Sequence, residues 1–237
     1  MMRNVALILS LLSLPLSARA APSVVPDAVI AIDVLIDPDP AMRAHAVAAN
    51  ARLLKSFPKG FTFDATHHPH LTFLQTYVRV SALASVYAAV GKVLTEEHPE
   101  SWKLTAYGYD AGPWDGVKLA GIQVHRTDDL VRLQSKLLEA IAPFTAKSGT
   151  ADAFFTTKSD PKVEPRIIDY VAEYASNGTG PKYKPHVTIG VASEESAGTL
   201  LAEKFDPFVW SPAGVSVYQL GSFGTARKRL KRWTLNS

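Results

Sequence analysis

A five-residue pattern occurs twice in this chain, once in each half. It reads PHLTF at Pro69–Phe73 and PHVTI at Pro185–Ile189, so that proline, histidine, an aliphatic residue, threonine and an apolar residue follow one another in both places. Alternate side chains of a β-strand lie on the same face, so each histidine should share a face with its threonine while the aliphatic residue between them enters a core. Two such strands constrain the fold strongly, because they predict two similar halves.

The hydrophobic pattern around the two motifs predicts a similar order of elements in both halves. The order is strand, helix, motif strand, helix and two strands, and then helix, motif strand, helix and two strands. Besides the second motif, strands are expected at 29–36, 70–80, 102–109, 117–124, 215–220 and 230–235, and helices after Asp39, Ser81 and Thr127, from Pro165 and over Glu194–Lys204. Interleaved helices and hairpin-joined strands predict an α+β fold with two lobes rather than a doubly wound parallel sheet.

The N-terminus has the pattern of a cleaved export signal. Arg3 precedes the apolar run Val5–Leu16, and Ala18 and Ala20 give a small-x-small cleavage site. The run is too short for a membrane anchor, which needs roughly 18–20 apolar residues. We therefore expect residues 1–20 to be removed, the remainder to form a single bilobal domain over 21–237, and the protein to be periplasmic or secreted without a membrane span.

The composition excludes several classes of protein. The chain has no cysteine, hence no disulfide and no thiolate metal site. Of its 25 basic residues, Arg3 and Arg19 lie in the expected signal, which leaves 25 − 2 = 23 against 22 acidic residues. A net charge this close to zero does not indicate a general nucleic-acid-binding protein, which needs a concentrated positive surface. The basic cluster at Ala226–Trp233 is expected to be a charged edge strand. No GxSxG elbow, P-loop or GxGxxG motif stands between a strand and a helix, so acyl transfer, nucleotide triphosphate hydrolysis and dinucleotide binding are not indicated.

A single His-x-Thr triplet carries little information, and the chain supplies its own control. The triplet His125–Thr127 also fits, but His125 ends a predicted strand and Thr127 is expected to cap a helix. His70 and His186 instead begin apolar strands after a proline. Two copies of the five-position pattern favour a functional role over two unrelated polar residues at strand starts.

One imidazole and one hydroxyl from each of two similar strands suit the chemistry of a phosphate ester. Histidine titrates close to neutrality, so one copy can accept a proton while the other donates one. The hydroxyls of Thr72 and Thr188 could hydrogen-bond the non-bridging phosphate oxygens. No metal or other cofactor is required for this chemistry.

The two motifs, at equivalent points of a duplicated α+β chain, resemble the paired His-x-Thr motifs of the two-histidine (2H) phosphoesterase superfamily. That superfamily includes the 2′-5′ RNA ligase-like proteins and the cyclic phosphodiesterases. The resemblance covers roughly Val29 to Leu235, and VYQLGSFG at Val217–Gly224 is similar to the family's closing strand and turn. It implies two antiparallel sheets with outer helices that enclose a central cleft.

The resemblance also implies an activity and the residues that carry it out. The family's reactions are metal-independent openings of cyclic phosphodiesters, cleavage of 2′-5′ linkages and the reverse ligation. His70 and His186 match the catalytic pair, and Thr72 and Thr188 match the hydroxyls that hold the phosphate. The implied partner is a nucleotide or an RNA-terminal phosphodiester, and we expect the protein to act as a monomer.

Further residues are candidates for other roles. Tyr183 precedes the second motif and could contact the substrate, and residues 146–181 lack clear periodicity, which is typical of a lid-like excursion. Two alternatives stay open. The chain could be a non-catalytic module that binds a phosphorylated ligand or RNA on the same fold, or a metal-binding protein that uses His67, His68 and His70.

Overall fold

The computed structural model describes residues 27–158 and 160–235, so the expected export signal lies outside the described residues. The strands are β1 (Val29–Pro38), β2 (Leu71–Arg79), β3 (Leu104–Trp114), β4 (Val117–Val124), β5 (Thr145–Ala146), β6 (His186–Ala192), β7 (Phe208–Trp210), β8 (Pro212–Leu220) and β9 (Ala226–Thr234). The α-helices are α1 (Pro40–Ser56), α2 (Leu83–Glu97), α3 (Asp128–Ile141), α4 (Pro165–Asn177) and α5 (Glu194–Ala202). Within the described ranges, none of these helices combines the length and the hydropathy needed to span a bilayer.

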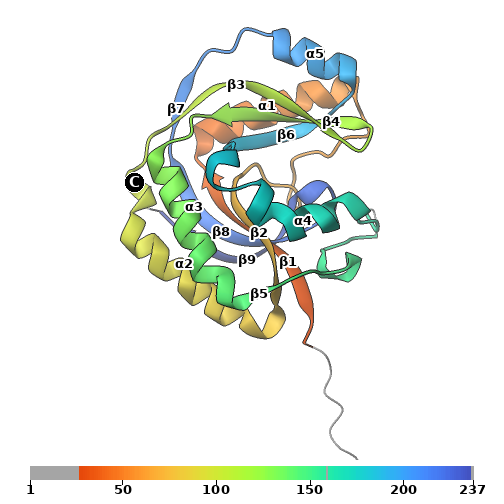
Figure 1. Ribbon diagram of the computed structural model, residues 1–237. Helices are drawn as coiled ribbons and strands as arrows, with labels where there is room; N and C mark the ends of the chain where they lie inside the picture. Colours follow the sequence, from red (N-terminus) through yellow and green to blue (C-terminus); the bar gives the residue numbers. More distant parts are fainter. Residues whose placement is uncertain (1–26, 159, 236–237) are drawn as a thin grey trace, which may run out of the picture.

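The strands form one curled antiparallel sheet (Figure 1), which confirms the α+β class. Their order is β7-β3-β4-β6-β2-β1-β8-β9, with β5 paired to β2. The sheet has a β2 half (β2, β1, β8, β9) and a β6 half (β6, β4, β3, β7), and in the described residues the strand pairing between them is that of Leu71 with Val187, hereafter the central pair. We expected two separate sheets; the middle residues of the two motifs face each other closely enough to join the halves into one.

The helices cover the sheet in two groups. α1 packs on β6, and α5 packs on β3, β4 and β6, while α2 and α3 pack on each other and α3 also contacts β2 (Figure 1). The central pair is fully buried in the core beneath these helices, as the alternation of the motifs predicts. The histidines and threonines of the motifs are thereby left on the opposite face of the sheet.

A local sequence signal explains where α1 begins, but not where α2 begins. The carboxylate of Asp39 accepts from the Met42 amide at 2.9 Å, and Pro40 occupies the first turn of α1, as predicted. Ser81 does not cap α2 as we expected. It lies in a short 3₁₀ turn, its hydroxyl donates to Asp27, and α2 begins at Leu83.

A β-bulge follows the threonine of both motifs. The β1–β2 register skips Phe73, and the β4–β6 register skips Ile189. Thr72 and Thr188 therefore occupy matching places in the two halves, in agreement with the internal repeat expected from the motifs. A bulge bends its strand and changes the direction of neighbouring side chains.

The excursion over residues 146–181 is anchored to the sheet by a small core of its own. Phe154, Ile167 and Val171 are buried against Tyr77 of β2 and Leu220 of β8. The Tyr77 hydroxyl also donates to the carbonyl of Ile168 at 2.9 Å. The segment thus brings α4 over the β2 half, where it forms one wall of a pocket.

Candidate active site

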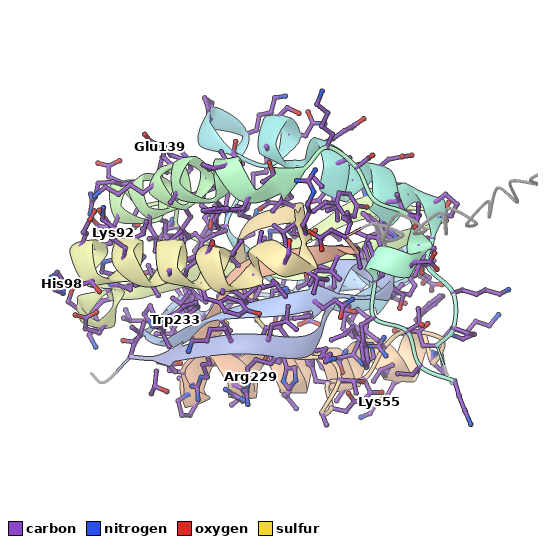
Figure 2. The ribbon with its side chains drawn as sticks, turned by 90° about the horizontal axis from the view of Figure 1, so that it is seen from below. Lys55, Lys92, His98, Glu139, Arg229 and Trp233 are labelled. Carbon is purple, nitrogen blue, oxygen red and sulfur yellow. The ribbon has the colours of Figure 1, made fainter. Side chains whose placement is uncertain are left out.

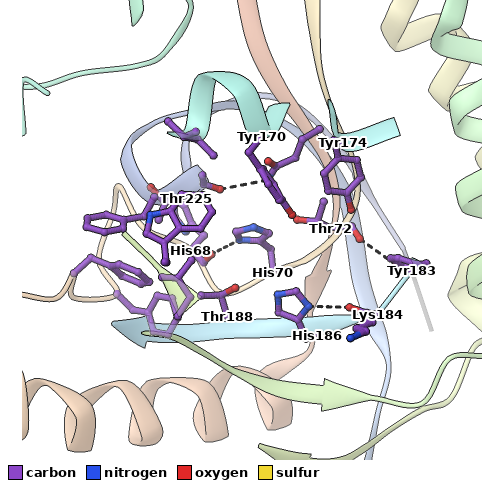
Figure 3. A pocket seen from close by; sticks show the side chains of 18 residues that line it. His68, His70, Thr72, Tyr170, Tyr174, Tyr183, Lys184, His186, Thr188 and Thr225 are labelled. Carbon is purple, nitrogen blue, oxygen red and sulfur yellow. Dashed lines mark hydrogen bonds between the residues drawn. The ribbon is translucent and has the colours of Figure 1, made fainter. Parts of the chain in front are cut away.

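A pocket lies beside the central pair, on the face of the sheet that carries the motif histidines (Figure 3). It encloses about 730 Å³, part of which is open to solvent. Both histidines and both threonines of the motifs line it. The other lining residues are largely aromatic and include Phe61, Trp114, Tyr170, Tyr174 and Phe223.

The pairing of the motif strands explains why these four side chains meet. In an antiparallel ladder, the residue before one partner faces the residue after the other. The central pair therefore sets His70 opposite Thr188 and Thr72 opposite His186. Each imidazole stands next to the hydroxyl of the other motif, an arrangement that brings the two halves into one site.

Both histidines are held by the same local hydrogen bond. His70 Nδ1 lies 2.6 Å from the carbonyl of His68, and His186 Nδ1 lies 2.8 Å from the carbonyl of Lys184. A carbonyl only accepts, so Nδ1 carries the hydrogen in both rings. The lone pair of each neutral ring is then on Nε2, and both rings point into the pocket (Figure 3).

The proline of each motif accounts for this geometry. Pro69 and Pro185 lie between the histidine and the residue whose carbonyl accepts from it. Proline fixes its φ angle near about −65°, which limits where the preceding carbonyl can lie relative to the following ring. The proline is therefore part of the motif because it orients the imidazole.

The two histidines differ in their surroundings. The side chain of His70 is 11% exposed, whereas His186 is an exposed residue. Burial lowers the pKa of His70 to about 4, although the hydrogen bond to the His68 carbonyl acts in the opposite direction and the charge of His186 lowers it further. His70 is therefore a neutral imidazole near neutral pH.

A buried aspartate that we did not predict lies behind the first motif. Asp33 Oδ2 accepts from Thr72 Oγ1 at 2.7 Å and from Gln75 Nε2 at 3.0 Å, and it lies 3.6 Å from His70 Nε2. Burial raises the pKa of Asp33 to about 8, against the effect of the hydrogen bonds from Gln75 and Thr72. The sequence signal is a lone acidic residue inside the apolar run VIAIDVLI.

The two halves diverge at this position. Counted outward from the two bulges, the paired residues Asp33 and Gln75 of the β2 half match Leu119 and Val191 of the β6 half. Leu119 lines the pocket from the side of β4. The scaffold is repeated, but the buried carboxyl occurs on the side of the first motif.

The two threonines also differ. The hydroxyl of Thr72 is bonded to Asp33, whereas within residues 27–158 and 160–235 nothing hydrogen-bonds the hydroxyl of Thr188. Thr188 therefore offers its hydrogen to the pocket directly. The expectation that both hydroxyls act alike on a phosphate stays a prediction for Thr72, since its hydroxyl already has a partner.

Tyr183 lies at the pocket in a supporting position. Its ring lines the pocket but is 4% exposed, and its hydroxyl donates to the backbone carbonyl of Thr72 at 3.0 Å. Burial raises the pKa of Tyr183 well above its usual value, so the hydroxyl stays protonated. It holds the first motif in place, and its contact with a substrate stays a prediction.

The three histidines proposed as metal ligands do not converge. His67 Nε2 lies 3.1 Å from an Arg227 guanidinium nitrogen, His68 Nε2 bonds the carbonyl of Ala65, and His70 faces the pocket. In the part of the chain that the structure describes, no group of three or more His, Cys, Asp or Glu side chains could hold a metal ion. The arrangement therefore does not support the metal-binding alternative.

Two other sequence features lie outside the pocket. His125 stacks on Tyr107, with ring centroids 4.2 Å apart, and the Thr127 hydroxyl caps α3. The basic cluster forms β9 at the edge of the sheet, where Figure 2 shows Arg229 and Trp233 on the outer strand. Neither feature contributes a residue to the pocket.

Several solved structures have a similar architecture. TT0787 of Thermus thermophilus is 16% identical, over 87% of this chain and 98% of that chain, with a TM-score of 0.51. A structure described as a phosphoesterase (16% identity, 88% and 99% coverage, TM-score 0.45) and Escherichia coli LigT complexed with 3′-AMP (16%, 89% and 100%, 0.42) also match. No protein-family model and no curated protein sequence matches the chain. The chain therefore shares its fold with TT0787.

Proposed function

We propose that this protein is a phosphodiesterase that acts on cyclic or 2′-5′ phosphodiesters of nucleotides or RNA ends by two-histidine general acid–base catalysis. One observation carries the proposal. Two imidazoles from the two motifs point into a single pocket, and the same hydrogen bond leaves Nε2 of both rings available for proton transfer. Two groups of this kind on either side of a phosphorus atom suit an in-line displacement.

We assign His70 the role of the base in the hydrolytic direction. Its ring is neutral, and Nε2 can remove a proton from water as the water oxygen bonds to phosphorus. An anionic phosphate in the pocket favours the imidazolium, so it makes His70 a stronger base in the complex than in the free protein. The exposed ring of His186 then gives a proton from Nε2 to the ribose oxygen as its bond to phosphorus breaks.

The remaining groups fit an anionic substrate that carries an aromatic base. The Thr188 hydroxyl can donate to a non-bridging oxygen, and Lys184 lines the same pocket with a cationic side chain. Trp114 and Tyr170 pack edge to face, with centroids 5.7 Å apart, and form an apolar wall on which a base can stack.

The test is hydrolysis of a 2′,3′-cyclic nucleotide by the purified protein in excess EDTA. We expect a bell-shaped pH profile, and a loss of about a hundredfold or more in kcat for His70→Ala and for His186→Ala, with nearly unchanged thermal melts. His125→Ala is the matched control, because this histidine also belongs to a His-x-Thr triplet but lies outside the pocket. Full activity in both motif variants would refute the proposal, and ligand binding without turnover would favour the non-catalytic module.

We also propose that the protein acts outside the cytoplasm. The support is the signal-like pattern of residues 1–20. Expression of the full chain, followed by cell fractionation and mass spectrometry of the N-terminus, should give a product that begins at Ala21. Recovery of an intact N-terminus in the cytoplasmic fraction would contradict this proposal.

A further inference from the structure

The carboxyl of Asp33 is unusual among the buried groups of this molecule. The residue is fully buried, and its Oδ1 has no hydrogen-bond partner in the described part of the chain. Oδ2 has two partners, Thr72 and Gln75, and both are uncharged. Within 4 Å of its oxygens, the described residues supply one basic group, His70 Nε2 at 3.6 Å.

This environment suits a neutral carboxylic acid better than a carboxylate. A buried carboxylate with one unpaired oxygen and no lysine or arginine partner is costly, whereas an unpaired oxygen of a neutral acid costs much less. With the proton on Oδ2, Asp33 donates to the Thr72 hydroxyl and still accepts from Gln75. The hydrogen of the Thr72 hydroxyl is then free to point into the pocket, which this side chain lines.

Loss of that proton reverses the arrangement. A carboxylate accepts only, so Thr72 must turn its hydrogen toward Asp33 and away from the pocket. The negative charge then lies directly behind the two groups that would meet a phosphate, Thr72 and His70. Both changes disfavour an anion in the pocket.

We propose that Asp33 is a positioning residue whose proton decides whether Thr72 offers its hydrogen to the reacting phosphate. This inference rests on the proposed function, because the anion is taken to be the reacting phosphate. It assigns the two threonines different roles. Thr188 donates at any pH, and Thr72 donates only while Asp33 is protonated.

Other groups that face Asp33 must be separated from it in a test. They are His70 before β2, Tyr170 and Tyr174 on α4, and Tyr183 before β6, and the same pocket is also lined by His68, Lys184 and His186. On β8, Tyr218 pairs with Asp33 in the sheet. Burial raises the pKa of each of these tyrosines, and Lys184 is kept in every variant compared. His186 is the group to remove.

The experiment measures the affinity for sulfate, whose charge does not change over the pH range used, by calorimetry in a His186→Ala background. We expect affinity to fall about tenfold between about pH 6 and 9, and the part of this fall above about pH 7, where the lowered pKa values of His68 and His70 leave both rings neutral, to be lost after Asp33→Asn. Asp37→Asn is the matched control, since Asp37 is a buried aspartate of the same strand whose carboxyl binds Ser216 and Arg232, and it should keep the fall. An equal fall in the Asp33→Asn protein would overturn the proposal.

A measurement without any substitution guards against misfolded variants. Infrared spectra of the wild-type protein should show the C=O band of a protonated carboxyl at about pH 6 and its loss at about pH 9. Absence of this band at the lower pH would also overturn the proposal. Sulfate binding needs no turnover, so the two proposals can fail separately. If the pH dependence of sulfate affinity requires Asp33 but the protein hydrolyses no phosphodiester, only the proposed function is refuted. If the protein hydrolyses the phosphodiester but the pH dependence of sulfate affinity does not require Asp33, only this inference is refuted.

Discussion

The β2 half and the β6 half present the same His-x-Thr motif in different surroundings. Each has the proline, the histidine held through Nδ1, the threonine and the bulge that follows it. Beside the first motif, however, the chain places Asp33 and Gln75, and beside the second it places Leu119 and Val191. A repeated scaffold thus brings two identical groups together, while unequal neighbours leave one ring exposed and bury the other, which lowers the pKa of His70.

The largest expected effect is a loss of kcat that identifies which histidine is the general acid. A 4-nitrophenyl phosphodiester has a leaving group that needs no proton, so His186→Ala should cost less than about tenfold in kcat on it, against about a hundredfold or more on a cyclic nucleotide. His70→Ala should lose about a hundredfold or more on both substrates. Steady-state rates on the two esters check this prediction. Equal losses for the two variants on the aryl ester would show that the halves do not have the assigned roles.

The next largest effect concerns how the free energy of unfolding changes with pH. The folded pKa of Asp33, about 8, lies above the ordinary value of 3.8, so the folded protein binds a proton that the unfolded chain releases, and stability falls as pH rises between these values. The folded pKa of His70, about 4, lies below 6.5, so its contribution rises with pH between these values and opposes that of Asp33. Above about pH 6.5 the fall due to Asp33 is no longer opposed by His70.

Asp33→Asn should therefore remove a loss of up to about 2 kcal/mol between about pH 6.5 and 8, which corresponds to several °C in Tm. Thermal melts of the wild type and the variant at a series of pH values measure the difference. Asp37→Asn serves as the control and should melt with the pH dependence of the wild type. Parallel curves for the wild type and Asp33→Asn would mean that Asp33 is ionised across this window.

A smaller effect should follow from placing a carboxyl in the other half. Leu119→Asp puts an acidic group at the position that matches Asp33, but on a half-buried residue where it stays ionised. Repulsion of an anionic substrate should raise KM about tenfold with a modest change in kcat. Leu119→Asn is the uncharged control and should raise KM much less. If both substitutions raise KM equally, lost packing rather than charge explains the effect.

The smallest expected effect is a loss of kcat when the space beside the exposed His186 is filled. Gly121 occupies the position that matches Leu35, and a Cβ added there would lie 3.1 Å from His186 Cδ2. Gly121→Ala should displace the ring by a few tenths of an ångström and lower kcat about two- to fivefold. Gly112→Ala, where nothing lies within 4 Å of the added Cβ, should leave kcat unchanged. A kcat for Gly121→Ala equal to that of the wild type would show that His186 tolerates this displacement.

Much of this architecture follows from sequence patterns with strong physical causes. The alternation within PHLTF and PHVTI predicts the buried middle residues and a shared face for histidine and threonine, and the structure confirms both. Asp39 and Thr127 begin helices because their side chains bond amide groups three residues on. His125 could be set aside because its neighbours have a structural explanation.

Other features depend on contacts that no local pattern contains. In the described residues one residue pair links the two halves of the sheet, and the position of Asp33 depends on strand register, which places its carboxyl behind Thr72. The acidic residue in an apolar strand was visible in the sequence, but its partner lies on another strand. The small core beneath α4 likewise combines residues far apart in the chain, which is why residues 146–181 show little periodicity of their own.

The hydrogen bond between each imidazole and the carbonyl two residues before it has a consequence for how such a site can evolve. Every atom that sets the tautomer belongs to three consecutive residues, His68 to His70 or Lys184 to His186. A substitution elsewhere can change the electrostatic surroundings of a ring without changing which nitrogen holds the lone pair. Three consecutive residues thus set the orientation of each imidazole, whereas residues on other strands adjust its pKa separately.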